Sequence, residues 1–398
     1  MKNNKRKIAV FTGNRAEYGL QFPILKAIKE HPDLDYQLIV SGAHLDDNFG
    51  STIAEIRKDG FEIHAEVEIE MDKDTATATA QAISTGIFSM SQALEALQPD
   101  VLVVYADRFE GFAGVIAGTQ MNIPTAHIEG GDITEGGALD DSVRHAMTKL
   151  SHFHFTTNEE ATQRILAMGE EPWRVHTVGF PAIDMIQENN YATPEELVDN
   201  YGLNLEQPVV LFTQHSVTTE FDQSKAQLAP SLAAMKQLAS EGIQVILTYP
   251  NNDAGGRFII EALEDFMREG HANIQLHKSL GRYNYHGVLA LAKDQKYRAV
   301  CVGNSSSGVK ETPAFFCPSV DIGSRQMGRL RAENVLHTEY DTEEIYQSVK
   351  RCLDAAFVAE CRSIVNPYGM GDAGLKIANV LASADLDRVK VLRKKMTI

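Results

Sequence analysis

The fold class follows most clearly from one short stretch of the chain, Val101-Leu102-Val103-Val104-Tyr105-Ala106-Asp107-Arg108. Its first five residues are apolar or aromatic, which predicts a buried β-strand at 101–105. A carboxylate and a guanidinium group follow at once, and such charges are costly at a buried strand end unless they are paired or used in chemistry. The pattern therefore predicts a parallel sheet with functional groups at the carboxyl ends of its strands.

The same pattern of a short buried run and an amphipathic stretch of helical length recurs along the chain in both directions. In the first half, the predicted strands are residues 7–12, 36–41, 101–105, 124–128, 152–156 and 175–178. In the second half, they are residues 209–213, 244–248, 274–277, 298–302, 319–322 and 335–338. Strands that alternate with helices form parallel sheets, and ligands bind at the carboxyl ends of such strands. We therefore predict an α/β protein with two Rossmann-like doubly wound domains and an active site in the inter-domain cleft.

The composition argues against several classes of function. The 398 residues include 37 Lys plus Arg and 54 Asp plus Glu, and the net charge of −17 argues against general binding of nucleic acid or an anionic membrane. No apolar run reaches the length of a membrane span, and the run Ile8–Phe11 is too short for a signal peptide. The four cysteines contain no CxxC pair, which predicts reduced thiols. We therefore expect a cytoplasmic protein without membrane or nucleic-acid partners.

Two motifs that suggest a cofactor or a metal have simpler explanations. Residues 369–374 fit GxGxxG, but Asn366-Pro367-Tyr368 precedes them instead of a strand, so we predict a turn that enters a helix. His152 and His154 share one face of a predicted strand, yet no cysteine lies near them and the chain has no HExxH motif. We predict hydrogen-bonded core or cleft histidines there, and we expect neither a metal nor a redox cofactor.

Polar segments follow several predicted strands of the first half, where side chains point into the cleft. The turn 13–19 opens a helix, and Arg15 within it suits either a phosphate contact or a solvated surface turn. Asp107 and Arg108 form either a structural ion pair or part of a site.

Carboxylates are concentrated in the next two segments. Glu129 follows the strand at 124–128, and Asp140 and Asp141 lie at a predicted helix start, where acids are also favoured as caps. Carboxylates that face one cleft push their pKa values apart, so that one is protonated and one ionised, as general acid–base catalysis requires.

Two hydroxyl-rich segments follow strands of the second half. His215 lies in the segment 213–219, and its imidazole suits donation to a phosphate oxygen or protonation of a departing one. Residues 303–311 form a small turn before a helix, in which Ser305 and Ser306 offer donors to a diphosphate. Glu311 lies one turn into that helix, where it can accept from ribose hydroxyls. A serine-rich helix cap is the alternative explanation of this turn.

Taken together, these segments resemble those of the hydrolysing UDP-N-acetylglucosamine 2-epimerases of sialic acid biosynthesis. The similarity runs from Lys7 to Leu381. It rests on the motifs NRAEY (14–18), DR (107–108), HIEGG (127–131), DDSVRH (140–145), QHSVTT (214–219), PNND (250–253), GNSS (303–306) and GSRQ (323–326).

The resemblance implies a fold of the glycosyltransferase-B type. Residues 1–185 would form an N-terminal domain with the acid–base carboxylates, residues 186–375 a UDP-binding domain, and residues 376–398 a terminal helix that packs back on the N-terminal domain. The residues that match the family's acid–base groups are Asp107, Glu129, Asp140 and Asp141. Those that match its UDP contacts are Arg15, Arg108, His215, Ser305, Ser306, Glu311 and Arg325. Those that match histidines associated with activity in the family are His44, His127, His152 and His154.

The implied reaction converts UDP-N-acetylglucosamine and water to N-acetylmannosamine and UDP, through elimination to a glycal and then hydration. Two departures from the vertebrate pattern leave the identity of the hexose open: Tyr105-Ala106 replaces His-Gly, and the loop 132–138 is longer. The alternatives are the same reaction on UDP-2,4-diacetamido-2,4,6-trideoxyglucose, a non-hydrolysing epimerase, a retaining glycosyltransferase of the same fold, and a non-catalytic nucleotide-sugar-binding protein. The resemblance also implies a homodimer or homotetramer.

Overall fold

The structure is a computed structural model, and it describes residues 5–45, 52–69, 76–133, 139–251 and 255–397. Of the segments singled out above, residues 134–138 of the loop and Asn252 and Asp253 of the PNND motif lie outside the described residues. The chain divides into two compact units. Unit 1 comprises Met1–Asp132, Gly137–Met185 and Tyr368–Ile398, and unit 2 comprises Ile133–Gly136 and Ile186–Pro367. Within the described residues, no helix combines the length and the apolar character that crossing a bilayer requires.

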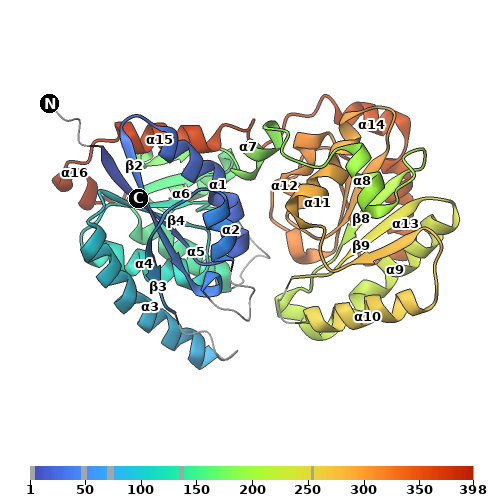
Figure 1. Cartoon of the computed structure of the whole chain (residues 1–398), viewed down its shortest axis with the longest axis horizontal. Helices are drawn as coiled ribbons and strands as arrows, with labels where there is room; N and C mark the ends of the chain where they lie inside the picture. The colour runs from blue at the N-terminus through green and yellow to red at the C-terminus, as the bar shows by residue number, and fades with distance from the viewer. Residues whose placement is uncertain (1–4, 46–51, 70–75, 134–138, 252–254, 398) are drawn as a thin grey trace. The chain divides into compact units, whose positions relative to one another are not determined.

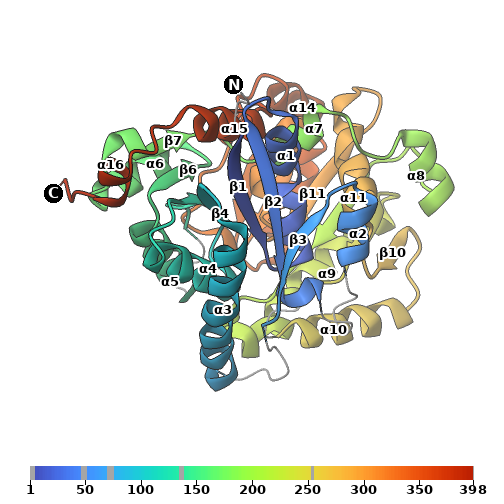
Figure 2. The ribbon, with the colours of Figure 1, turned by 60° about the vertical axis from the view of Figure 1, so that its left-hand side comes forward.

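The described strands of unit 1 form a seven-stranded parallel sheet in the order β3-β2-β1-β4-β5-β6-β7. The strands are β1 (Arg6–Thr12), β2 (Leu34–Ser41), β3 (Ile63–Val67), β4 (Val101–Tyr105), β5 (Thr125–Ile128), β6 (Phe153–Thr156) and β7 (Val175–Thr177). The helices up to the chain's entry into unit 2 are α1 (Arg15–Glu30), α2 (Ile53–Lys58), α3 (Ala76–Leu97), α4 (Phe109–Gln120), α5 (Leu139–Leu150), α6 (Glu159–Ala167) and α7 (Ala182–Gln187). Figure 2 shows β1 and β2 side by side, with β3 beyond β2 at the sheet edge.

Strand β3 is missing from the strands predicted above. Its residues alternate between half-buried and exposed, and only Val67 is buried. The strand lies at an edge of the sheet, where His64 and Glu66 are exposed. A search for buried β-branched runs overlooks such a strand, because burial on both faces is a property of the central strands of a parallel sheet.

Apolar layers cover both faces of the unit 1 sheet, because successive residues of a strand point to opposite faces. Ile8 and Val10 pack in the layer that includes α1, whereas Ala9 and Phe11 pack in the layer that includes α3, α4 and α5. All four side chains are fully buried. This double burial explains the near-continuous apolar runs from which the central strands are predicted.

The GxGxxG segment at 369–374 forms the turn that leads into α15 (Ala373–Ser383), so the predicted helix-entry turn is confirmed. The backbone N–H groups of Ala373 and Gly374 donate to the Asp184 carboxylate at 3.0 and 2.7 Å. A dinucleotide phosphate would need such N–H donors at the start of a helix. Here they donate to the Asp184 carboxylate instead.

The end of the chain packs within unit 1, where α15 lies along α1 (Figure 1). The chain returns to unit 1 at Tyr368. The terminal segment also contains a second short helix, α16 (Arg388–Leu392). Asp387 caps α16 by accepting from the Lys390 N–H at 2.9 Å.

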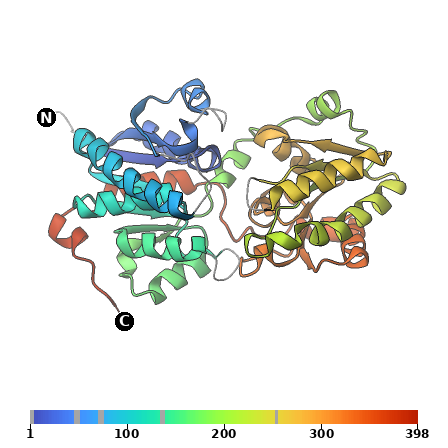
Figure 3. The same cartoon turned by 90° about the horizontal axis from the view of Figure 1, so that it is seen from below.

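The described strands of unit 2 form a six-stranded parallel sheet in the order β10-β9-β8-β11-β12-β13. The strands are β8 (Val209–Thr213), β9 (Gln244–Thr248), β10 (Ile274–His277), β11 (Ala299–Gly303), β12 (Ser319–Ile322) and β13 (Val335–Thr338). The helices are α8 (Pro194–Tyr201), α9 (Ser224–Ser240), α10 (Gly256–Arg268), α11 (Gly281–Ala290), α12 (Ser307–Lys310), α13 (Thr342–Cys352) and α14 (Ala355–Cys361). Figure 3 shows α9 and α10 side by side, and both contribute to one apolar layer of the sheet.

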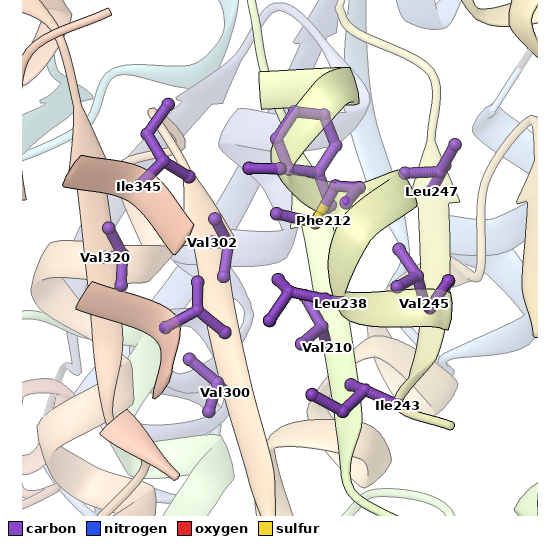
Figure 4. Packing of buried hydrophobic residues seen from close by; sticks show 14 of the residues in the cluster. Val210, Phe212, Leu238, Ile243, Val245, Leu247, Val300, Val302, Val320 and Ile345 are labelled. Atoms are coloured by element: carbon purple, nitrogen blue, oxygen red, sulfur yellow. The ribbon is translucent and has the colours of Figure 1, made fainter. Parts of the chain in front are cut away.

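The core of unit 2 follows the same two-residue period. Val210 and Phe212 of β8 and Val300 and Val302 of β11 point to one face, where they meet Leu238 of α9 and other apolar residues (Figure 4). Burying one such side chain stabilises a fold by about 1.5–3 kcal/mol. The four cysteines are buried and unpaired, as predicted. The polar loops described next begin at the carboxyl ends of these packed strands.

Candidate functional site

The loops after β4 and β5 hold two non-glycine residues in the left-handed backbone region. Ala106 has φ 55° and Glu129 has φ 64°. Their N–H groups donate to Ile128 O at 3.0 Å and to Phe155 O at 2.9 Å, so neighbouring strands hold both residues in place. Backbone strain of this kind costs of order 1–3 kcal/mol and is concentrated at functional sites. Both predicted carboxylates at these strand ends, Asp107 and Glu129, thus lie on a constrained backbone.

A buried arginine joins two of the predicted acid–base residues. Arg144 of α5 is 2% exposed. Its Nη2 donates to Asp107 Oδ2, and its Nη1 donates to Asp141 Oδ1 at 3.2 Å. Asp141 is buried, whereas Asp140, one residue earlier on α5, is exposed. The guanidinium therefore fixes two carboxylates from different elements in one cluster.

Arg144 lies in the DDSVRH motif but is not among the predicted site residues. The available signal is its spacing, because residues three apart on a helix lie on one face and Asp141 precedes Arg144 by three. The contact with Asp107, from a different strand, is visible only in the folded chain.

Glu129 lies near a buried phenol. The side chain of Tyr105 in β4 is fully enclosed, and burial and then the Glu129 carboxylate raise its pKa well above the usual range. The Tyr105 phenol is therefore neutral near neutral pH. Asp132 is a further buried acid of this region; it accepts from Thr157 Oγ1 at 2.9 Å and from Asn158 Nδ2 at 3.2 Å.

The four candidate histidines of unit 1 are buried and bonded within the fold. His127 is within 3.1 Å of Thr148 Oγ1 through Nδ1, and within 2.6 Å of Ala106 O through Nε2. His44 Nε2 lies 3.1 Å from Thr12 Oγ1, and His154 Nε2 lies 3.0 Å from Glu170 Oε2. His152 Nδ1 accepts from the Thr125 N–H at 3.0 Å. Burial lowers the pKa of His127 to about 3 and that of the other three to about 4.

Through these bonds, the neutral imidazoles join neighbouring segments of unit 1. His127 has the most direct relation to the candidate site, because it bonds the carbonyl of Ala106 directly before Asp107. Within the part of the chain that the structure describes, no group of three or more His, Cys, Asp or Glu side chains is placed to hold a metal ion.

The two arginines predicted to contact UDP from unit 1 have different surroundings. Arg15, at the start of α1, forms an exposed ion pair with Glu55 at 3.0 Å. Arg108 is the residue before α4, where its side chain makes no capping hydrogen bond, and its Nε lies 3.5 Å from Glu110 Oε2. The Glu110 side chain is fully buried, and apart from this ion pair neither of its oxygens accepts a hydrogen bond from the described residues.

Glu17 is a second buried acid, and it is not among the predicted site residues. Burial and then the charge of Glu110 raise its pKa to about 8. Its Oε2 accepts from Gly13 N at 3.3 Å and its Oε1 accepts from Gln21 Nε2 at 2.8 Å. The motif NRAEY contains Glu17, but only burial distinguishes it from an ordinary acid in the first turn of a helix.

In unit 2, one buried asparagine connects the loops after three strands. Asn304 follows β11; its Oδ1 accepts from His215 N at 2.7 Å and its Nδ2 donates to His215 O at 2.9 Å. Its own carbonyl accepts from Arg325 Nη1 at 3.2 Å and from Gln326 Nε2 at 2.8 Å, in the loop after β12. The structure thus brings the predicted residues His215 and Arg325 together, and Asn304 was not among those predicted.

The hydrogen bonds of His215 define its tautomer. Nδ1 accepts from the backbone N–H of Asn251 at 3.0 Å. Burial and then the charge of Arg325 lower the pKa of His215 to about 3. The ring is therefore neutral near neutral pH, with its proton on Nε2, where it serves as a hydrogen-bond donor.

The serine turn of unit 2 leads from β11 into α12. Gly303 has φ 129°, and a Cβ there would lie 1.9 Å from Thr213 O, so only glycine permits this approach of β11 to β8. Ser305 and Ser306 follow it and are half-buried. Glu311, just after α12, accepts through Oε2 from His286 Nε2 at 2.7 Å and from Ser307 Oγ at 2.9 Å. Burial opposes the ionisation of Glu311, but the bonds from His286 and Ser307 leave its pKa lowered.

Comparison with known proteins identifies the family. The chain matches the family described as UDP-N-acetylglucosamine 2-epimerase over residues 26–382. It is 33% identical over 349 residues to the UDP-N-acetylglucosamine 2-epimerase of Neisseria meningitidis serogroup B, covering 87% of each chain. It is 32% identical over 381 residues to the UDP-N,N'-diacetylbacillosamine 2-epimerase (hydrolyzing) of Legionella pneumophila, covering 96% of this chain and 97% of that one.

The fold agrees with this assignment. The crystal structure of Methanocaldococcus jannaschii UDP-GlcNAc 2-epimerase in complex with UDP-GlcNAc and UDP matches this chain with a TM-score of 0.74 and 17% identity, and the match covers 94% of this chain and 99% of that one. The predicted α/β fold with two doubly wound sheets of the glycosyltransferase-B type is confirmed, and so is the resemblance to the family. The chain therefore belongs to the UDP-N-acetylglucosamine 2-epimerase family.

Proposed function

We propose that the protein is a hydrolysing epimerase that converts UDP-N-acetylglucosamine and water to N-acetylmannosamine and UDP. The observation that carries the proposal is the cluster in which Asp107 and Asp141 share the buried Arg144, with Glu129 at the end of the neighbouring strand. Carboxylates in this setting suit the removal and return of a carbon-bound proton. The Legionella relative is named as hydrolyzing, which favours hydrolysis over return of a UDP-sugar.

The first proposed step is an elimination. Asp107 or Glu129 removes the proton at C2, and the electron pair of that C–H bond forms the C1–C2 double bond. The C1–O bond breaks at the same time, and UDP leaves with its electron pair. The products of this step are UDP and a glycal.

The second proposed step is hydration of the glycal. Water adds at C1 and loses its proton to a carboxylate, while Asp141 or its neighbour Asp140 delivers a proton to C2 from the opposite face. The sum of both steps consumes one water and yields N-acetylmannosamine and UDP. Each such proton transfer contributes about 10²- to 10⁴-fold to the rate.

The groups of unit 2 are proposed to hold UDP. The Nε2–H of His215, the Arg325 guanidinium and the turn Ser305–Ser306 stabilise the charge that develops on the diphosphate, and Glu311 accepts from the ribose. Arg15 and Arg108 of unit 1 are proposed to add positive charge to the same ligand. The proposal requires both sets of groups to act on one substrate molecule.

Incubation of the pure protein with UDP-N-acetylglucosamine in deuterated water tests the proposal. The expected products are free UDP and N-acetylmannosamine with deuterium at C2, detected by NMR. A UDP-linked product would identify a non-hydrolysing epimerase, and a requirement for an acceptor would identify a glycosyltransferase. Binding without turnover would identify a nucleotide-sugar-binding protein.

A second substrate has specific support. The Legionella relative, which is named for a diacetylbacillosamine substrate, aligns over 96% of this chain. We therefore propose UDP-2,4-diacetamido-2,4,6-trideoxyglucose as the alternative substrate of the same reaction. The ratio of kcat/KM for the two UDP-sugars decides between them. Light scattering of the same preparation tests the proposed homodimer or homotetramer.

A further inference from the structure

Glu311 is held by two donors that reach the same oxygen. His286 lies on α11 and is 4% exposed, and its Nε2 is 2.7 Å from Glu311 Oε2. Ser307 Oγ donates to that same Oε2 at 2.9 Å. The carboxylate therefore has one oxygen that is fully engaged by the protein, while the side chain as a whole remains 13% exposed.

The surroundings of His286 define which nitrogen carries its proton. Nδ1 is buried and has no hydrogen-bond partner within the described residues. Nε2 faces a carboxylate oxygen, which accepts only, so the proton lies on Nε2. The ring packs against Phe315 with centroids 5.3 Å apart, which limits its rotation. His286 thus orients Glu311 and has no other hydrogen bond in this part of the structure.

We propose that His286 is a positioning residue that makes this site select ribose over deoxyribose. With Oε2 engaged by the protein, Oε1 is the oxygen that is left to accept from a ribose hydroxyl. A ligand that lacks this hydroxyl leaves a partly buried carboxylate oxygen without a donor, which is the arrangement that discriminates most strongly between such ligands. The proposal rests on the proposed binding of UDP through Glu311.

The expected effect is on the ratio of two affinities. Wild-type protein should bind UDP about 10- to 100-fold more tightly than whichever of 2′-deoxy-UDP and 3′-deoxy-UDP lacks the recognised hydroxyl. His286→Phe keeps the ring but removes the donor, so Glu311 is no longer fixed. The ratio should then fall to about 2-fold, mainly through weaker binding of UDP.

Isothermal titration with UDP and both deoxy nucleotides measures these ratios, and thermal unfolding checks each variant. His286→Gln can present an amide N–H in place of Nε2–H and should restore most of the discrimination. His271→Phe is the matched control, because that ring stacks on Phe266 elsewhere in unit 2. If His286→Phe does not fold, His286→Asn serves instead, since its shorter amide cannot reach Glu311.

Three outcomes decide against the inference or its premise. An unchanged ratio in a folded donor-free variant overturns it, and so does an equal loss of affinity for all three nucleotides, which indicates a purely structural role. A wild-type protein that binds UDP and both deoxy nucleotides equally also overturns it. Failure of wild-type protein to bind UDP at all rejects the proposed function instead, so the two failures are distinguishable.

Discussion

In unit 1, the loops after β4 and β5 carry the carboxylates Asp107 and Glu129 and two strained residues, and Arg144 of α5 bonds Asp107, whereas in unit 2 the loops after β8 and β11 carry neutral donors joined by one asparagine. In both regions the loops follow the carboxyl ends of parallel strands. Their electrostatics differ because Arg144 gathers anionic groups in unit 1, while burial keeps the imidazole of His215 neutral in unit 2. The difference agrees with the proposal that unit 1 carries out proton transfer and unit 2 binds the anionic diphosphate.

The largest expected effect separates these two tasks directly. Glu129→Gln removes a carboxylate from unit 1 without changing its size, so turnover should fall by about 10²- to 10⁴-fold. The affinity for UDP, measured by titration, should stay within about 2-fold of wild type, since the proposed diphosphate groups are intact. Glu159→Gln on the exposed start of α6 is the control. Near-normal turnover in Glu129→Gln would remove this residue from the proposed mechanism.

The next change breaks the carboxylate cluster itself. Arg144→Met leaves Asp107 and Asp141 without their shared partner, and loss of one member of a buried ion pair costs about 3–5 kcal/mol of unfolding free energy. Chemical denaturation measures this loss, and steady-state kinetics should show lower kcat in whatever protein remains folded. Arg57→Met breaks an exposed pair with Glu66 and should cost under about 1 kcal/mol. Equal costs of the two substitutions would contradict the role given to burial.

A complementary change in unit 2 should weaken UDP binding more than it lowers the turnover rate. Arg325→Ala removes a charge proposed to contact the diphosphate, and we expect UDP affinity to fall about 10-fold or more. Calorimetric titration measures the affinity, with Arg268→Ala on the exposed surface of α10 as control. Unchanged UDP affinity would show that Arg325 serves only its bond to Asn304 O.

The smallest effect is a pH dependence of stability that arises in unit 1. Folding raises the pKa of Glu17 from 4.5 to about 8, so the folded protein holds this proton over a pH range in which the unfolded chain has lost it. The stabilisation is fully present below pH 4.5 and is lost as pH rises toward about 8.

Removing the titrating group tests this dependence. Glu17→Gln should flatten the decline of the unfolding free energy across this pH range, as measured by denaturation at several pH values. Glu30→Gln, at the exposed end of the same helix, should leave the decline as in wild type. The same slope in Glu17→Gln and wild type would assign the dependence to other groups.

Most of the architecture is predictable from local patterns, and the exceptions have a common cause. Central strands such as β4 and β8 are buried on both faces and give continuous apolar runs. Strand β3 is an edge strand with alternating exposure, so its pattern is weak. The turn at 369–374 is recognisable because Asn366-Pro367-Tyr368, rather than a strand, precedes it.

The sequence predicts many of the residues of the candidate site, but it does not predict which other residues they contact. Asp107, Glu129 and His215 stand out because polar residues follow apolar strands. The partners Arg144 and Asn304 do not stand out, because their importance comes from contacts with residues 37 and 89 positions away. Likewise, the residues that neighbour His127 in the sequence do not show whether its side chain lines a cleft or bonds a backbone carbonyl inside the fold.

The amino-acid sequence by itself determined the alternation of strands and helices, the two parallel sheets and the family, because these depend on periodic burial and on short motifs read along the chain. The tertiary structure alone decided which charges meet, which imidazoles are neutral and which oxygen of Glu311 is engaged by His286. The physical reason is that hydrogen bonds and pKa values depend on distance and burial in space, and the packing of distant segments sets both.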